Sequence, residues 1–207
     1  MEDAQKFAKD FKIPNVYDDY EKLCQDPKVE AIYIGAIHTE HAKWAQVALK
    51  NGKHVLCEKP LCVNAREVSE TYEVYKSSGK FLMEAMWTRF VPAHCKVREL
   101  IESGIIGKPK VVQASFGFKM SKDADRLWKN NMGGGAVLDL GVYPITFANM
   151  VFGEGGKKFP TKIVATGELT DDEERVDTQE SITLQSVGEQ FLMCRIHDAW
   201  IAASFVT

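Results

Sequence analysis

Helical and strand-like segments alternate over the first 84 residues, and this alternation limits the possible folds more than any other feature of the sequence. Short connections between alternating helices and strands are typical of a parallel sheet built from right-handed crossovers. The chain opens on a helix, however, and the GxGxxG pattern occurs nowhere in its 207 residues. We therefore expect residues 1–84 to form a Rossmann-type domain that is truncated at its N-terminus. Apolar spacing and capping residues predict helices over 2–11, 18–24, 39–50 and 64–77, and strands over 29–35, 54–57 and 80–84.

The pattern changes near residue 85, where we place a domain boundary. Strand-like runs at hairpin spacing follow, which favour an open and largely antiparallel sheet in an α+β domain over residues 85–207. The last predicted strand reaches the end of the sequence, so truncation is expected there as well. The elements predicted in this part are helices over 90–103 and 136–151, a loop over 121–131, and strands over 110–118, 161–170, 179–187, 190–196 and 199–206.

Composition excludes several classes of function. A net charge of −3, a pI near 6.0 and the lack of a Lys/Arg run give no general attraction to nucleic acid or to an anionic membrane. The five cysteines form no CxxC pair, which indicates reduced thiols and argues against a metal centre. We find no signal peptide and expect no apolar run of membrane-spanning length. These features predict a cytoplasmic protein.

The predicted strand 54–57 ends abruptly in Glu58, Lys59 and Pro60. In an open α/β sheet, ligands bind at the carboxyl ends of the strands. Proline restricts the residue before it to extended or turn geometry, which would point the Lys59 ammonium into that crevice. The simpler alternative is a strand that leaves the sheet with a surface lysine.

A second notable stretch runs from Gly133 to Pro144. Its three glycines allow close backbone approach and leave the amides of a helix start free to face an anion or a carbonyl. Asp139 and Tyr143 are four residues apart and share one face of a helix. If Lys59 lay beside it, the phenol would be favoured as its anion and could take the hydroxyl proton of a substrate that gives up a hydride. Alternatively, Asp139 caps the helix and Tyr143 is a half-buried aromatic residue.

Two further groups of side chains could line a ligand site. His38 and His41 lie three apart at a predicted helix start, where a capping or crevice-lining role is favoured over zinc because no third ligand is evident. Trp87 and Arg89 follow the strand 80–84 and could clamp a flat ring or a phosphate. They could equally fix the joint between the two domains.

The order of Glu58-Lys59-Pro60, Met83-Glu84-Ala85 and the GGG-x3-D-x3-Y block resembles the Gfo/Idh/MocA oxidoreductases, in particular their dimeric dihydrodiol dehydrogenase and D-xylose dehydrogenase members. The resemblance implies a homodimer that uses NADP, or alternatively NAD, to oxidise a CH–OH group of a cyclic diol or an aldose. It implies catalytic roles for Lys59, Tyr143 and Asp139. The resemblance also places the cofactor against His38, His41, Glu58, Lys59, Pro60, Trp87 and Arg89, and the substrate against Trp87, Phe116 and Tyr143. It allows a cis bond before Pro60.

One departure from the family separates two hypotheses. The family's first strand, its glycine-rich phosphate turn and its ribose-recognising residue have no counterpart in this sequence, and the pyrophosphate is held mainly by that turn. The first hypothesis is an NADP-dependent oxidoreductase. The second is a catalytically inactive fragment or isoform that serves as a dimerisation or protein-interaction module.

Overall fold

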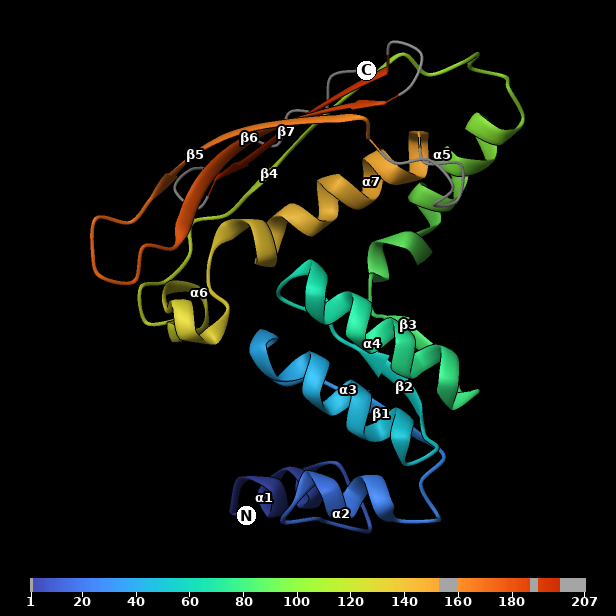
Figure 1. The fold of residues 1–207 in the computed structure, drawn as a ribbon, viewed down its shortest axis with the longest axis vertical. Helices are drawn as coiled ribbons and strands as arrows, with labels where there is room; N and C mark the ends of the chain where they lie inside the picture. Colours follow the sequence, from blue (N-terminus) through green and yellow to red (C-terminus); the bar gives the residue numbers. More distant parts are fainter. Residues whose placement is uncertain (1, 153–159, 187–189, 198–207) are drawn as a thin grey trace. The chain divides into compact units, whose positions relative to one another are not determined.

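The computed structural model describes residues 2–152, 160–186 and 190–197. The chain divides into two compact units, Met1–Ala85 and Met86–Thr207 (Figure 1). The predicted strand over 199–206 lies outside the described residues.

The first unit is a three-stranded parallel sheet with helices between its strands, as predicted. Its sheet has the order β1-β2-β3, with Ala31 beside His54 and Val55 beside Leu82. The helices α3 and α4 pack against each other (Figure 1). The elements are α1 (Glu2–Asp10), α2 (Tyr20–Gln25), β1 (Ala31–Ile34), a 3₁₀ turn η1 (His38–Glu40), α3 (His41–Lys50), β2 (His54–Cys57), α4 (Ala65–Ser78) and β3 (Leu82–Glu84).

Capping residues explain where these helices begin and end. The Asp19 carboxylate accepts a hydrogen bond from the Glu21 amide at the start of α2, and the Asn64 side chain accepts one from the Glu67 amide at the start of α4. Gly79 ends α4 with a φ of 64°, a left-handed conformation that glycine adopts without strain. Apolar side chains of β1, β2 and α3 form the core of the unit, which buries Ile32, Ile34, Ala45, Ala48, Leu49, Val55 and Cys57.

The second unit packs one long helix against a four-stranded sheet of order β4-β7-β6-β5 (Figure 1). The pairs β5–β6 and β6–β7 are antiparallel and β4–β7 is parallel, so the predicted largely antiparallel sheet is confirmed. The elements are η2 (Trp87–Phe90), α5 (Pro92–Glu102), β4 (Val111–Gly117), α6 (Asp125–Trp128), η3 (Asn130–Met132), η4 (Val137–Gly141), α7 (Val142–Phe152), β5 (Lys162–Leu169), β6 (Asp177–Ser186) and β7 (Gln190–His197).

Two predictions about this unit need correction. The predicted loop over 121–131 contains α6 and η3, which are too short to produce a helical apolar period in the sequence. The predicted helix over 136–151 is not uniform, because Val137–Gly141 forms a π-helical turn before α7 begins. A π-helical turn of this kind is frequent at functional sites.

The apolar content of this helical region also contradicts an expectation from composition. The segment Asn130–Phe152 is long and apolar enough to cross a membrane, judged by length and composition alone. In the structure 44% of its apolar window is buried, and Ala136, Leu140 and Ala148 belong to the core of the unit. A core helix of a soluble protein passes the same test.

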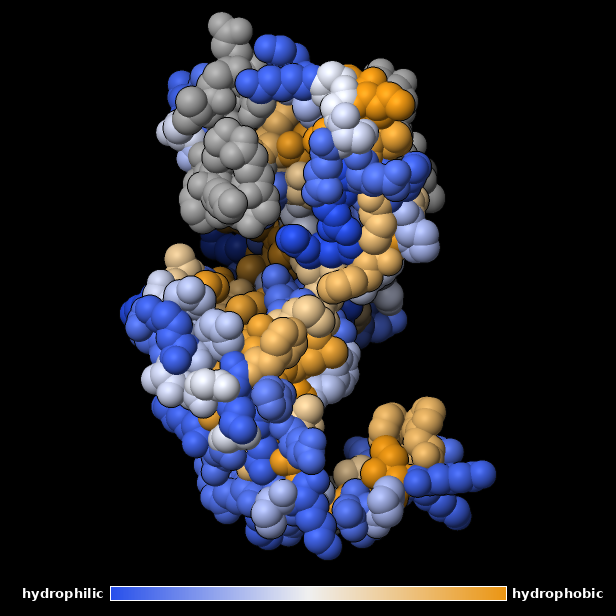
Figure 2. Space-filling view, turned by 90° about the vertical axis from the view of Figure 1, so that its right-hand side faces the viewer, coloured by the Kyte–Doolittle hydropathy of each residue, from blue (hydrophilic) through white to orange (hydrophobic). Residues whose placement is uncertain are grey.

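Several large apolar side chains remain at the surface, and hydrophobic residues form patches among hydrophilic ones (Figure 2). On α1, Phe7 and Phe11 are exposed and their ring centroids lie 4.5 Å apart. On β5, all eight residues are exposed, including Ile163 and Val164. Each unit therefore presents apolar area to its surroundings.

Candidate active site

In the first unit, the charged residues Glu58 and Lys59 follow directly after the carboxyl end of β2. The Tyr33 hydroxyl at the end of β1 donates to Glu58 Oε1 at 2.5 Å, and this hydrogen bond raises the pKa of Tyr33. The Lys59 amide donates to Glu58 Oε2 at 3.3 Å. Lys59 itself is half-buried, and the Lys59–Pro60 bond is cis, which confirms the expectation for that bond. Glu58 thus holds the turn that carries the lysine.

The next strand end supports the same turn from the other side. The Glu84 carboxylate at the end of β3 accepts the Leu61 amide at 2.9 Å, and the Ala85 amide donates to the Cys57 carbonyl at 2.7 Å. Two carboxylates, Glu58 and Glu84, therefore fix the backbone just before and just after the Lys59–Pro60 bond.

The two predicted histidines are both buried, His38 in η1 and His41 at the start of α3. His41 is fully buried, with Nδ1 2.7 Å from the Pro60 carbonyl oxygen and Nε2 3.0 Å from the Ala36 carbonyl oxygen. Both ring nitrogens therefore lie against backbone carbonyl oxygens, one of them in the turn that follows Lys59. His38 is also buried, with its ring centroid 5.8 Å from that of His41.

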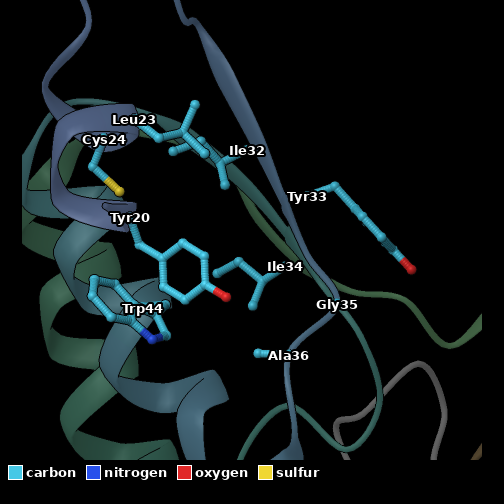
Figure 3. A pocket seen from close by; sticks show the side chains of 9 residues that line it. All are labelled: Tyr20, Leu23, Cys24, Ile32, Tyr33, Ile34, Gly35, Ala36 and Trp44. Atoms are coloured by element: carbon cyan, nitrogen blue, oxygen red, sulfur yellow. The ribbon is translucent and has the colours of Figure 1, made fainter. Parts of the chain in front are cut away.

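A cavity of about 240 Å³ lies beside β1 in the same unit. Tyr20 and Trp44 form one wall, with ring centroids 4.9 Å apart in an edge-to-face arrangement, and Tyr33 points away from them (Figure 3). Leu23, Cys24, Ile32 and Ile34 make the rest of the lining largely apolar. Among the described residues that line this cavity, none is a predicted catalytic residue. Two of them contact Glu58: the Tyr33 hydroxyl donates to its carboxylate, and the Ile34 carbonyl accepts its amide at 2.9 Å.

The second unit contains an aromatic cavity of about 190 Å³ that includes the three predicted substrate residues. It lies between η2, α5, β4 and α7 and is lined by Trp87, Thr88, His94, Gln113, Ala114, Ser115, Phe116, Tyr143, Pro144 and Phe147. Apolar, concave sites with a few polar groups are the usual form of small-molecule sites. His94 and Phe147, whose ring centroids lie 5.5 Å apart, were not predicted because nothing in their sequence neighbourhood marks them.

Tyr143 is the centre of this aromatic group. The Trp87 indole Nε1 donates to the Tyr143 hydroxyl at 3.2 Å, and the ring centroids are 6.0 Å apart. The Phe116 ring meets Tyr143 edge-to-face at 5.2 Å. The structure thus brings together the three residues that the resemblance assigned to the substrate. Arg89 is exposed on the same 3₁₀ turn as Trp87 and is not part of the cavity lining found in the described residues.

Asp139 lies within the π-helical turn and is not the N-cap, which is Ala136. Its side chain is 7% exposed and pairs with the Arg126 guanidinium, Nη1 to Oδ1, at 3.1 Å. The guanidinium is half exposed at 50%. Arg126 comes from α6 and could not be found in the sequence, because α6 was predicted to be loop.

The glycine-rich turn holds an anion from the chain itself. The Val137 amide at the helix start donates to Asp177 Oδ2 at 2.6 Å. A Cβ added to Gly135, whose φ is 109°, would lie 2.0 Å from Asp177 Oδ1. A Cβ at Gly134 would lie 2.6 Å from the Leu127 carbonyl oxygen. The backbone of the glycine-rich turn is therefore closely approached, as expected. The helix-start amide of Val137 faces an anion, which is the Asp177 carboxylate of the chain itself.

Family models match both units. Residues 1–86 match the model described as an oxidoreductase family with an NAD-binding Rossmann fold, and residues 94–200 match the GFO/IDH/MocA C-terminal domain. The chain therefore belongs to the Gfo/Idh/MocA family of oxidoreductases, as the sequence motifs indicated.

Among curated relatives, the chain is similar to trans-1,2-dihydrobenzene-1,2-diol dehydrogenases. It is 40% identical to the protein from Xenopus tropicalis over 92% of this chain and 56% of the relative. It is 44% identical to the protein from Mus musculus over 89% of this chain and 54% of the relative. The chain thus spans about half the length of the curated relatives it matches.

Solved structures show the same fold. A 3-ketoreductase from Actinomadura kijaniata, in complex with NADP and TDP-benzene, is 27% identical with a TM-score of 0.83, over 98% of this chain and 60% of that one. An aldose-aldose oxidoreductase from Caulobacter crescentus, complexed with glycerol, is 21% identical with a TM-score of 0.86, over 96% of this chain and 60% of that one.

Proposed function

We propose that this chain provides the reacting residues of an NADP-dependent oxidoreductase that oxidises a CH–OH group of a cyclic diol or an aldose. The observation that carries the proposal is the Tyr143 hydroxyl, which accepts the Trp87 N–H among the aromatic walls of a cavity. The names of the curated relatives, trans-1,2-dihydrobenzene-1,2-diol dehydrogenases, support a cyclic diol as substrate. An aldose stays the second substrate class, which rests on the resemblance of the sequence motifs to D-xylose dehydrogenases.

In the proposed reaction, the substrate C–H electron pair and its hydrogen leave as a hydride, and the hydroxyl proton passes to the oxygen of a deprotonated Tyr143 side chain, which becomes the neutral phenol. The carbinol becomes a carbonyl. When bound, the cofactor accepts the hydride. The indole N–H of Trp87 is a donor only, so it fixes the Tyr143 oxygen and supports negative charge on it. The faces of Trp87 and Phe116 offer apolar area to a ring substrate.

The Glu58–Lys59–Pro60 turn would hold the nicotinamide end of the cofactor. A half-buried lysine beside a carboxylate, at the carboxyl ends of parallel strands, fits the position where such sheets bind nucleotides. Lys59 would orient the substrate oxygen, and Glu58 would keep the turn in place. No residue is assigned to the pyrophosphate, because the sequence contains no GxGxxG pattern. We propose NADP rather than NAD because the structure of the related 3-ketoreductase is a complex with NADP.

A titration of the 207-residue chain with NADPH tests the proposal, followed by cofactor fluorescence and melting temperature. Saturable micromolar binding with a raised melting temperature is expected, because a ligand that binds only the folded state stabilises it. Lys59→Met should weaken binding, while Lys50→Met at the exposed end of α3 should not. A folded chain that gives no change at millimolar NADPH would rule out the enzyme proposal for this polypeptide.

A second candidate function is a dimerisation or protein-interaction module, favoured by β5, on which all eight residues are exposed. An exposed edge strand pairs readily with another chain. We propose that the second sheet forms a homodimer, with Ile163 and Val164 in the contact. Light scattering tests this: Ile163→Lys should shift a dimer to monomer, and an unchanged mass would contradict the interface.

We also propose a cytoplasmic location, consistent with the free thiols of Cys24, Cys57, Cys62 and Cys95.

A further inference from the structure

The hairpin turn between β5 and β6 holds the glycine-rich turn at two points. Before the glycines, the Asn130 amide donates to the Glu174 carboxylate at 2.8 Å. After them, the Val137 amide donates to Asp177 Oδ2 at 2.6 Å. Two carboxylates of one hairpin therefore bind backbone amides on both sides of Gly133–Gly135, the segment that leads into the helix of Tyr143.

The Asp177 carboxylate also lies very close to the backbone of Gly135. Its Oδ1 occupies the space that a Cβ on Gly135 would fill, at 2.0 Å from the ideal Cβ position. Because Gly135 has a φ of 109°, a side chain there would be strained in any case. Glycine at 135 therefore lets the carboxylate approach the helix start closely enough to accept the Val137 amide.

The hairpin turn itself is internally braced. The Thr170 amide donates to the Val176 carbonyl at 2.9 Å across the turn. The Asp172 carboxylate accepts the Thr170 hydroxyl at 2.6 Å and the Glu174 amide at 3.2 Å. Val176, next to Asp177, is buried. Asp177 is therefore presented from a rigid support, and a rigid support transmits position better than a loose one.

From this geometry we infer that Asp177 is a positioning residue, which fixes the helix start and through it the orientation of Asp139 and Tyr143. Only the effect of this positioning on turnover rests on the proposed function. The contacts that carry it lie within the second unit, so it can be tested without cofactor or turnover. It also explains the glycine-rich turn, because the Val137 amide at the helix start donates to the Asp177 carboxylate of the chain itself.

The test uses the Trp87 indole N–H as a reporter, because that group donates to the Tyr143 hydroxyl. The four tryptophans give indole signals in an amide correlation spectrum of the whole chain, and Trp87→Phe assigns the relevant one. Asp177→Ala should move this signal toward its position in Tyr143→Phe. Asp177→Asn keeps an oxygen acceptor for the Val137 amide and should leave the signal near its wild-type position.

Asp171→Ala removes an exposed carboxylate from the same hairpin turn and is the matched control. An unmoved Trp87 signal in Asp177→Ala, or an equal movement in Asp171→Ala, would overturn the inference. If Asp177→Ala does not fold, Gly135→Ala replaces it, because the added methyl group displaces the same carboxylate. An unmoved signal in folded Gly135→Ala would be equally decisive against it.

Activity gives a second, separate readout if the chain turns over. Asp177→Ala should lower kcat by about 10²-fold with little change in the KM for cofactor, since misplacement of a reacting group by about 1 Å has effects of that size. A moved Trp87 signal in a chain without turnover would support the inference and count against the proposed function. Failure of the Asp177 inference and failure of the proposed function would therefore give different results.

Discussion

The imidazole of His41 joins two strand ends, with Nδ1 2.7 Å from the Pro60 carbonyl oxygen. Its other nitrogen lies 3.0 Å from the carbonyl oxygen of Ala36, which follows β1. The ring is fully buried, and its contact with the Pro60 carbonyl is buried as well. His41 therefore helps to determine where the Lys59–Pro60 turn lies relative to β1.

Replacing His41 by Ala should destabilise the first unit by about 2–4 kcal/mol, because a backbone carbonyl group would lose its hydrogen-bond donor and a cavity would form at a fully buried position. Urea unfolding followed by circular dichroism measures this free energy. Lys50→Ala, at the exposed end of the same helix, should change it by less than about 0.5 kcal/mol. Equal effects of the two substitutions would show that the His41 contacts contribute little.

Replacing Tyr143 by Phe should separate stability from turnover. The aromatic contacts with Trp87 and Phe116 remain, so the free energy of unfolding should change by less than about 1 kcal/mol. Loss of the proton-accepting oxygen should lower kcat by about 10²–10⁴-fold. Steady-state kinetics and thermal unfolding are measured on the same samples. Retention of full kcat in Tyr143→Phe would exclude the tyrosine as the acid–base group.

The pair between Arg126 and Asp139 should contribute more to stability than an ordinary surface pair. The Asp139 side chain is 7% exposed, whereas both members of the Lys129–Asp125 pair are well exposed. Arg126→Met should destabilise the chain by about 1–2 kcal/mol, a value reduced from that of a fully buried pair because the guanidinium is half exposed. Lys129→Met should change stability by less than about 0.5 kcal/mol. Chemical unfolding at two salt concentrations makes the comparison, and similar losses would contradict it.

Burial of Cys57 predicts a loss of stability at high pH. Desolvation, with smaller effects from Cys62, Glu84 and Glu58, raises the pKa of the Cys57 thiol from about 9 to about 12. The folded state keeps the proton that the unfolded state releases, so the stabilisation is complete below pH 9 and is lost as the pH rises toward 12. The slope for one such group is about 1.4 kcal/mol per pH unit.

The stability difference between wild type and Cys57→Ala, measured by urea unfolding at several pH values, isolates this effect. This difference should be constant below about pH 9. Above about pH 9, the free energy of unfolding of wild type should fall relative to that of Cys57→Ala. A difference that is independent of pH up to about 11 would contradict the raised pKa. In the folded chain, Cys57 should also react with thiol reagents more slowly than the half-buried Cys95.

The sequence by itself determined the first unit well. Its predicted strand 54–57 has the observed bounds, and the helices of this unit begin and end within a few residues of the prediction. The reason is physical: caps such as Asn64 and left-handed glycines such as Gly79 act within a few residues of the element that they limit. The family motifs are local too, and they placed Lys59 at a strand end and Trp87, Phe116 and Tyr143 in one candidate site.

Only the tertiary structure decided the partners of these residues. Arg126 reaches Asp139 across 13 positions and Asp177 reaches Val137 across 40, and no local pattern records such distances. The burial of His41 could not be read from the sequence for the same reason, because the carbonyl that its Nδ1 contacts belongs to Pro60, 19 residues away. Side-chain burial and long-range hydrogen bonds depend on which elements pack together, and that packing is a property of the whole unit.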